Sequence, residues 1–133
     1  MRAVLADTGP LFALVDPGDQ HHARAHTDYR TLQRQRQQIV VPYPILLETY
    51  KLLMRNVRLG AAQAWLGEVG EVAAFVNPAA ADYDAASERV RRYPDQAITL
   101  EDALLTVLGE RLKLPVWTFD HHFGVLRAEV WRG

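Results

Sequence analysis

Short apolar runs alternate with longer amphipathic segments along the chain, and this alternation constrains the fold more than any other feature. The apolar runs predict buried strands at 4–6, 39–41, 72–76, 115–119 and 129–131. The segments between them predict helices at 10–15, 21–37, 43–55, 59–69, 79–93 and 99–113. Parallel strands need crossover connections, which are usually helices. The sequence therefore predicts an α/β fold with a parallel sheet covered on both faces.

The chain length and composition are those of one globular domain. It has 133 residues, of which 49% are hydrophobic and 23% charged, so we expect a single domain over 1–133. The absence of cysteine excludes disulfides, thiolate metal sites and a cysteine nucleophile. No apolar run has the length of a membrane span, and the first residues do not resemble a signal peptide. We therefore expect a cytoplasmic protein with no membrane partner.

Two aspartates each follow a predicted strand directly. Asp7 comes after the first strand and before a Gly-Pro pair that can start a helix, and Asp120 comes after the strand 115–119. The carboxyl ends of parallel strands meet at one edge of the sheet, where ligands bind. Two carboxylates there repel each other, and a divalent cation would relieve the repulsion. The alternative is that each aspartate only caps the next helix, which is worth about 1 kcal/mol.

A third acid, Asp102, lies in the first turn of a predicted helix. Thr99 and Asp102 fit a threonine-x-x-acid capping pattern, and the helix dipole favours an anion there. Capping alone would explain this residue. However, Ala103, Leu104 and Leu105 follow at once, so the acid is expected at the edge of the buried face.

The fourth acid, Glu48, interrupts an apolar pattern. Helical spacing over 43–55 places it on one face with Ile45, Leu52 and Arg55. A lone carboxylate on a buried stripe costs several kcal/mol unless it is paired or binds a metal. The alternative is an ion pair with a nearby arginine such as Arg55.

Four acids without cysteine indicate a site built from oxygen ligands. The histidines occur as the adjacent pairs 21–22 and 121–122, which lack the three- or four-residue spacing of a helical zinc site, so we expect them to be solvent-exposed. Oxygen ligands favour Mg²⁺ or Mn²⁺, which bridge to phosphate oxygens. The sequence thus predicts a metal site at which a phosphodiester is hydrolysed.

The charge balance gives no general attraction for nucleic acid. The net charge is −1, with 15 basic and 16 acidic residues, so binding would need a local patch. Candidate arginines for contacts with single-stranded RNA are Arg30, Arg34, Arg55, Arg58, Arg89 and Arg92.

Four motifs, in this order and at these separations, resemble the PIN domain, and in particular the small VapC-type toxins of toxin-antitoxin pairs. They are Leu5-Ala6-Asp7-Thr8-Gly9-Pro10-Leu11, Leu47-Glu48, Leu100-Glu101-Asp102-Ala103-Leu104 and Val116-Trp117-Thr118-Phe119-Asp120-His121-His122-Phe123. The resemblance implies a parallel five-stranded sheet of order 3-2-1-4-5 flanked by helices. It also implies an Mg²⁺- or Mn²⁺-dependent ribonuclease, a small cognate antitoxin whose tail covers the site, and a homodimer.

The resemblance also assigns roles to individual residues. Asp7 and Asp102 match the two aspartates usually assigned to the metal, and Glu48 and Asp120 complete the acidic quartet. Thr118 matches a hydroxyl residue that orients a carboxylate or a metal-bound water. One departure is His121, where many relatives carry arginine or lysine.

The resulting hypothesis is an endoribonuclease in which water attacks a phosphodiester and leaves a 3′-hydroxyl and a 5′-phosphate. One alternative is a non-catalytic module of the same fold that binds RNA or a protein. Another is a phospho-accepting, receiver-like domain, which would need a lysine at a strand end. Lys113 precedes Pro115 and does not stand at a strand exit.

Overall fold

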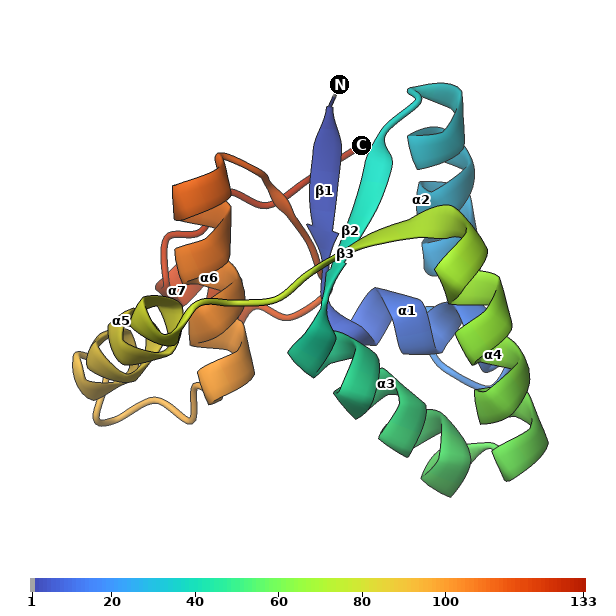
Figure 1. The fold of residues 1–133 in the computed structure, drawn as a ribbon, viewed down its shortest axis with the longest axis horizontal. Helices are drawn as coiled ribbons and strands as arrows, with labels where there is room; N and C mark the ends of the chain where they lie inside the picture. Colours follow the sequence, from blue (N-terminus) through green and yellow to red (C-terminus); the bar gives the residue numbers. More distant parts are fainter. Residues whose placement is uncertain (1) are drawn as a thin grey trace.

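A parallel four-stranded sheet runs through the middle of the molecule, with helices on both sides (Figure 1). The computed structural model describes residues 2–133. The strands are β1 (Ala3–Ala6), β2 (Gln38–Pro42), β3 (Ala73–Val76) and β4 (Val116–Trp117). The helices are α1 (Thr8–Val15), α2 (His22–Arg34), α3 (Tyr43–Asn56), α4 (Leu59–Val72), α5 (Ala80–Arg91), α6 (Leu100–Leu112) and α7 (His122–Val125). The expected α/β fold with a parallel sheet is confirmed.

The strand order is β3-β2-β1-β4, which matches the expected order for the first four strands. Leu5 of β1 pairs with Val40 on one side and with Val116 on the other, so the first strand lies at the centre. The expected fifth strand over 129–131 is reduced to one parallel bridge between Val116 and Val130. Only two backbone hydrogen bonds join this segment to β4, so Val130 takes the fifth position without forming a full strand.

The helices form two groups that cover opposite faces of the sheet. Figure 1 shows α1 to α4 on one side and α5 to α7 on the other. Val4, Leu5 and Ala6 of β1 have no solvent exposure, as expected for a strand covered on both faces. Helix α6 is buried continuously from Asp102 to Gly109. Within residues 2–133, none of the helices has both the length and the apolar character of a membrane span.

Element boundaries differ from the predicted ones mainly around β3 and β4. The strand predicted at 115–119 is shorter in the structure, where β4 ends at Trp117 and the next two residues lie outside the sheet. Val72 belongs to α4 and not to β3. The four-residue helix α7 was not predicted, since it is too short to show a helical pattern. The remaining helices agree with their predicted ranges to within a few residues.

The predicted inner face of α3 is wrong. Its buried residues are Ile45, Thr49 and Leu53, which follow each other at four-residue spacing. Glu48 is therefore half-buried at the side of this stripe, and Arg55 is exposed. The argument that Glu48 must be a carboxylate on a buried stripe does not hold, and its position needs another explanation.

An ion pair between Asp82 of α5 and Arg111 of α6 holds these helices together. Arg111 donates from Nε and Nη2 to the two carboxylate oxygens at 2.8 and 2.7 Å, and the Ala79 N–H donates to the same carboxylate at 2.8 Å. The bond with Arg111 lowers the pKa of the buried Asp82 carboxyl. The pair fixes α6, the helix that carries Asp102.

Candidate metal centre

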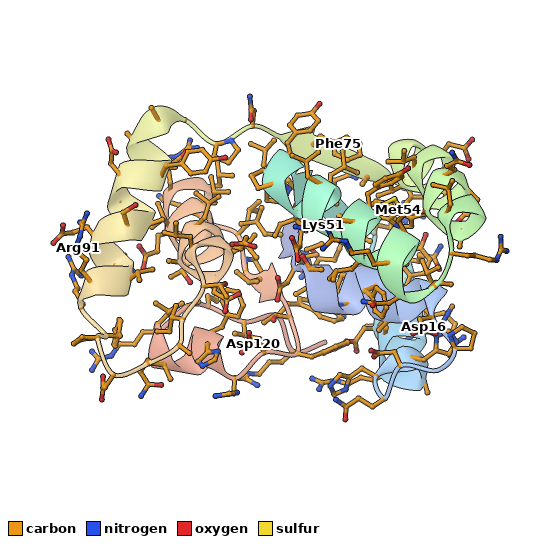
Figure 2. The ribbon with its side chains drawn as sticks, turned by 90° about the horizontal axis from the view of Figure 1, so that it is seen from below. Asp16, Lys51, Met54, Phe75, Arg91 and Asp120 are labelled. Atoms are coloured by element: carbon orange, nitrogen blue, oxygen red, sulfur yellow. The ribbon has the colours of Figure 1, made fainter. Side chains whose placement is uncertain are left out.

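The four predicted acids meet in one open pocket at the carboxyl edge of the sheet. Figure 2 views the molecule from below and labels one of these acids, Asp120. We call this pocket the acidic pocket; its volume is about 330 Å³. Its lining residues are Asp7, Thr8, Gly9, His21, Glu48, Thr99, Glu101, Asp102, Phe119 and Asp120. Among residues 2–133, no lysine or arginine contributes to this lining. Five carboxylates thus face one space, one more than the sequence predicted.

Asp7 is buried and held at both carboxylate oxygens. It is 7% exposed and acts as the N-cap of α1, where Oδ1 accepts a hydrogen bond from the Thr8 N–H at 2.8 Å. Oδ2 accepts from the Thr118 hydroxyl at 2.7 Å. The capping alternative is therefore correct for Asp7, and it is compatible with a place in the pocket. The two hydrogen bonds fix the direction of the carboxylate.

Thr118 connects two of the acids. Its hydroxyl donates to Asp7 and accepts from the backbone N–H of Asp120 at 3.0 Å. The Asp7 N–H also donates to the Trp117 carbonyl at 3.0 Å, which continues the pairing of β1 with β4. The contact between Thr118 and a carboxylate is the one that the sequence motif implies. Because the Thr118 hydroxyl joins the segments that follow β1 and β4, it sets where both acids lie.

Asp102 combines a cap position with an unsatisfied carboxylate oxygen. Its N–H donates to the Thr99 hydroxyl at 3.1 Å, as the capping pattern predicts. Its side chain lies in the pocket, and Oδ2 is fully buried without a hydrogen-bond partner among the described residues. A buried carboxylate oxygen without a partner is costly, and a cation would satisfy it. This oxygen is the most direct sign that the pocket suits a metal ion.

Burial and mutual repulsion make two of these acids weak. Burial raises the pKa of Asp7 to about 6, although the hydrogen bonds from Thr118 and Thr8 oppose the rise. Burial also raises the pKa of Asp102 to about 8, and the charges of Asp7 and Asp120 add to this. A bound divalent cation would reverse both shifts. The pocket is therefore electrostatically poised for a cation.

Asp120 lies against the two histidines that follow it. Its Oδ1 accepts from the backbone N–H of His122 at 2.9 Å and lies 3.0 Å from Nδ1 of the same residue. The His122 Nδ1 is also 4.0 Å from Oδ2 of Asp102. Asp120, His121 and His122 can bring one ligand atom each to within 4.8 Å of one another. The metal-binding group can therefore include nitrogen as well as oxygen.

The expectation that all four paired histidines are exposed holds only for His121, whose side chain is 83% exposed. The His122 side chain is only 20% exposed because it packs beside Asp120. His21 lines the acidic pocket, and Nδ1 of His22 hydrogen-bonds with the Ala13 carbonyl. The contact of His122 with Asp120 is local, whereas the contacts of His21 with Phe119 and of His22 with Ala13 join separate elements, which no pattern within one segment predicts.

Glu48 lines the pocket for a different reason from the predicted one. Its side chain is 28% exposed and pairs with Lys51, at 3.3 Å from Nζ to Oε2. The expected partner Arg55 is thus replaced by Lys51, one helical turn away on α3. Lys51 itself does not line the pocket, so Glu48 still adds negative charge there.

The six arginines proposed for RNA contacts do not line this pocket. Arg89 forms an ion pair with Glu110 at 2.7 Å, and Arg34 donates to Thr31. Glu101 was missed, although its place beside Asp102 in the first turn of α6 could have indicated it. Arg24 was also missed, and it lies beside the pocket over the ring of Phe119.

Thr118→Val is expected to weaken Mn²⁺ binding by about 10- to 100-fold, the usual effect of removing a partner that orients a metal ligand. Valine keeps the shape but loses the hydroxyl that holds Asp7 at 2.7 Å. Isothermal titration with Mn²⁺ measures the change, and Thr118→Ser, which keeps the hydroxyl, is the matched control. Equal affinity in the valine variant would show that Thr118 does not orient a ligand.

Two solved structures share this fold over their whole length. VapC20 of Mycobacterium tuberculosis, a sarcin-ricin loop cleaving toxin, has a TM-score of 0.84 and 21% identity, covering 98% of this chain and 100% of that chain. VapBC2 of Rickettsia felis, bound to a DNA fragment from its promoter, has a TM-score of 0.75 and 11% identity, covering 98% and 97%. No protein-family model matches the sequence, and no curated protein gives a significant match. The chain therefore has the VapC-like PIN-domain fold that its sequence motifs indicate.

Proposed function

We propose that this protein is a metal-dependent endoribonuclease and the toxin of a VapBC-type toxin-antitoxin pair. One observation carries the proposal: five carboxylates converge on one pocket, and a buried oxygen of Asp102 has no partner among the described residues. A protein that did not bind a cation would gain nothing from this repulsion. The receiver-like alternative lacks its lysine, since none lines the pocket among residues 2–133.

Asp7, Glu48, Asp102 and Asp120 would hold the metal ion. Carboxylate oxygens are hard ligands, which favour Mg²⁺ or Mn²⁺ over softer metals. When bound, such an ion lowers the pKa of a water molecule and stabilises charge that develops on a phosphoryl group. The side chains around these acids then have the task of orientation: Thr118 fixes Asp7, and Thr99 fixes the start of α6 below Asp102.

The proposed reaction is hydrolysis of an RNA phosphodiester. The oxygen of a water molecule forms a bond with phosphorus, the bond between phosphorus and O3′ breaks, and O3′ takes up a proton. The products are a 3′-hydroxyl and a 5′-phosphate.

Support for RNA as the substrate comes from the fold neighbours. VapC20 is described as a toxin that cleaves the sarcin-ricin loop, and its structural match covers 98% of this chain. The shared fold alone does not fix an activity. The acidic pocket of this chain supplies the chemistry that such an activity needs.

An antitoxin partner and a homodimer are part of the proposal. A groove of about 410 Å³ between α3, α5 and α6 carries the exposed apolar side chains of Leu47, Tyr83 and Leu100. Glu48 and Glu101 line both this groove and the acidic pocket. A protein bound along the groove would therefore reach the acids. Light scattering on the purified protein, alone and with its candidate antitoxin, measures both associations.

The test of the proposed function is cleavage of single-stranded RNA by protein purified free of any partner. We expect cleavage with Mg²⁺ or Mn²⁺, none with chelator, and 5′-phosphates on the downstream fragments by end sequencing. Cleavage that persists in chelator would contradict metal dependence. No cleavage of any RNA, together with no binding of Mn²⁺, would favour the non-catalytic alternative.

A further inference from the structure

A second pocket adjoins the acidic pocket at Phe119 and Asp120. We call it the side pocket; its volume is about 520 Å³. Its lining residues are Arg24, Asp28, Thr118, Phe119, Asp120, His121, Gly124, Val130, Trp131 and Arg132. They come from α2, from the segment after β4, and from the segment around Val130. The two pockets share lining residues, so one extended molecule can occupy both.

The two pockets differ in charge. The acidic pocket has five carboxylates and no lining arginine, whereas Arg24 and Arg132 both line the side pocket. An RNA strand carries a negative phosphate at every nucleotide, and arginine binds phosphate through its planar set of donors. A strand with one phosphate at the acids would therefore place a neighbouring phosphate near these two arginines.

Arg24 is held in place by an aromatic ring and not by an acid. Its Cζ lies 4.4 Å from the centroid of the Phe119 ring, and the ring of His21 lies 4.8 Å from the same centroid. Among residues 2–133, Arg24 has no ion pair and no side-chain hydrogen bond. Cation–π contact orients the guanidinium but leaves its N–H donors available for a ligand.

The rest of the side pocket has the features that a nucleobase needs. Trp131 is partly buried and packs edge-on against Trp117 at 6.5 Å, which holds an aromatic ring in the lining. Asp28 accepts from Nε1 of Trp117 at 3.0 Å through Oδ2, which leaves Oδ1 as an acceptor. Bases of single-stranded RNA stack on aromatic rings and offer N–H groups at their edges. The pocket volume lies within the usual range for a ligand of this size.

We infer that the side pocket is a nucleotide subsite, in which Arg24 and Arg132 bind a phosphate of the RNA strand and Asp28 accepts an N–H of an unpaired base. The inference rests on the proposed function, because it places this nucleotide next to the one whose phosphate lies at the acids. It replaces the six arginines predicted from sequence with two others. A base that enters the pocket cannot be paired, so the subsite selects single-stranded RNA or loops.

Binding of RNA in the absence of cleavage tests the phosphate contacts. The protein carries Asp102→Asn and the buffer contains chelator, and the anisotropy of a fluorescent single-stranded oligonucleotide reports the Kd. We expect Arg24→Met and Arg132→Met each to raise the Kd about tenfold and to reduce its salt dependence by about one counterion. Arg91→Met is the matched control, since Arg91 is exposed on α5, far from Asp120 in Figure 2.

If both arginine variants bind RNA with the Kd and salt dependence of the Arg91 control, the subsite is wrong. The cleavage assay separates this result from failure of the proposed function. With the native acids and Mn²⁺, the arginine variants should show a raised KM and a kcat close to that of the wild type. Cleavage with an unchanged KM overturns the subsite alone, whereas a wild type that binds RNA but does not cleave it overturns the nuclease.

The base contact is tested by Asp28→Asn, which can still accept from Trp117 but presents an amide to the base. Four oligonucleotides that differ at a single position are compared for binding to each protein. We expect the order of preference among the four bases to change, with little change in overall affinity. An unchanged order would overturn the base contact of Asp28.

Discussion

Asp102→Asn is expected to reduce RNA cleavage by at least about 100-fold, because loss of a direct ligand should cost no less than loss of a residue that orients one. The same change is expected to stabilise the metal-free protein at pH 8 by about 1–3 kcal/mol. Its carboxylate is buried between Asp7 and Asp120, and burial raises its pKa to about 8. An amide of the same shape removes the charge and can donate to the neighbouring acids.

A variant that cleaves RNA more slowly but unfolds less easily identifies Asp102 as a residue kept for function and not for stability. A residue that served only as a helix cap would lose stability and activity together when changed. Cleavage rates and urea unfolding, both measured on the same preparation, give the comparison. Asp84→Asn is the matched control, since Asp84 is exposed on α5 and lines neither pocket. If Asp102→Asn cleaves RNA at the rate of the wild type, Asp102 is not part of the catalytic site.

The metal-free protein is expected to lose stability as the pH rises from about 4 to 8, and Mn²⁺ is expected to restore it. The pKa values of Asp7 and Asp102 rise from 3.8 to about 6 and about 8 on folding. At pH values between the ordinary pKa and the raised pKa of each carboxyl, the unfolded chain binds fewer protons than the folded one. The free energy of unfolding therefore falls as the pH rises through this range. One pKa unit corresponds to about 1.4 kcal/mol, so ionisation of Asp7 alone lowers the free energy of unfolding by about 3 kcal/mol. Unfolding curves at several pH values measure this loss.

Proton release tests the same coupling directly. Because the Asp102 carboxyl is protonated at pH 7 and a metal ligand must be ionised, binding of Mn²⁺ should release about one proton. The Kd for Mn²⁺ should therefore fall about tenfold from pH 6 to pH 7. Calorimetry in buffers of different ionisation enthalpy counts the protons. Binding without proton release, at a Kd that does not vary with pH, would place the metal elsewhere.

The sequence predicts those features of the fold and site that depend on local pattern. Asp7 directly follows β1, and Asp120 lies three residues beyond the end of β4, close to its predicted place. Thr99 caps the helix that carries Asp102, so each acid could be placed approximately without knowing the fold. The Thr99 cap at the start of α6 and the buried position of Asp102 are both confirmed. The alternatives of capping and metal binding are also compatible, since the free N–H groups of a helix start and a cation attract the same carboxylates.

Features that depend on packing between distant segments could not be predicted. On α3, the sequence allows two inner faces, and the polar side chain of Thr49 concealed the correct one, which includes Ile45 and Leu53. The strand predicted at 115–119 ends at Trp117, and the next residue, Thr118, donates its hydroxyl to Asp7, a contact across 111 positions. Arg24 and Phe119 meet in the same way, from α2 and from the segment after β4. No periodicity within one segment reports such contacts.

The central position of β1 determines when during synthesis the acidic pocket can form. Leu5 and Ala6 pair with Val116 and Trp117, so one side of the first strand stays uncovered until a segment more than 100 positions later has been synthesised. A nascent chain that has not yet reached Thr118 and Asp120 lacks the hydroxyl that holds Asp7 and one of the five acids of the pocket. Because contacts between distant positions form late in folding, a ribosome-bound chain cannot assemble the acidic pocket before Asp120 has emerged.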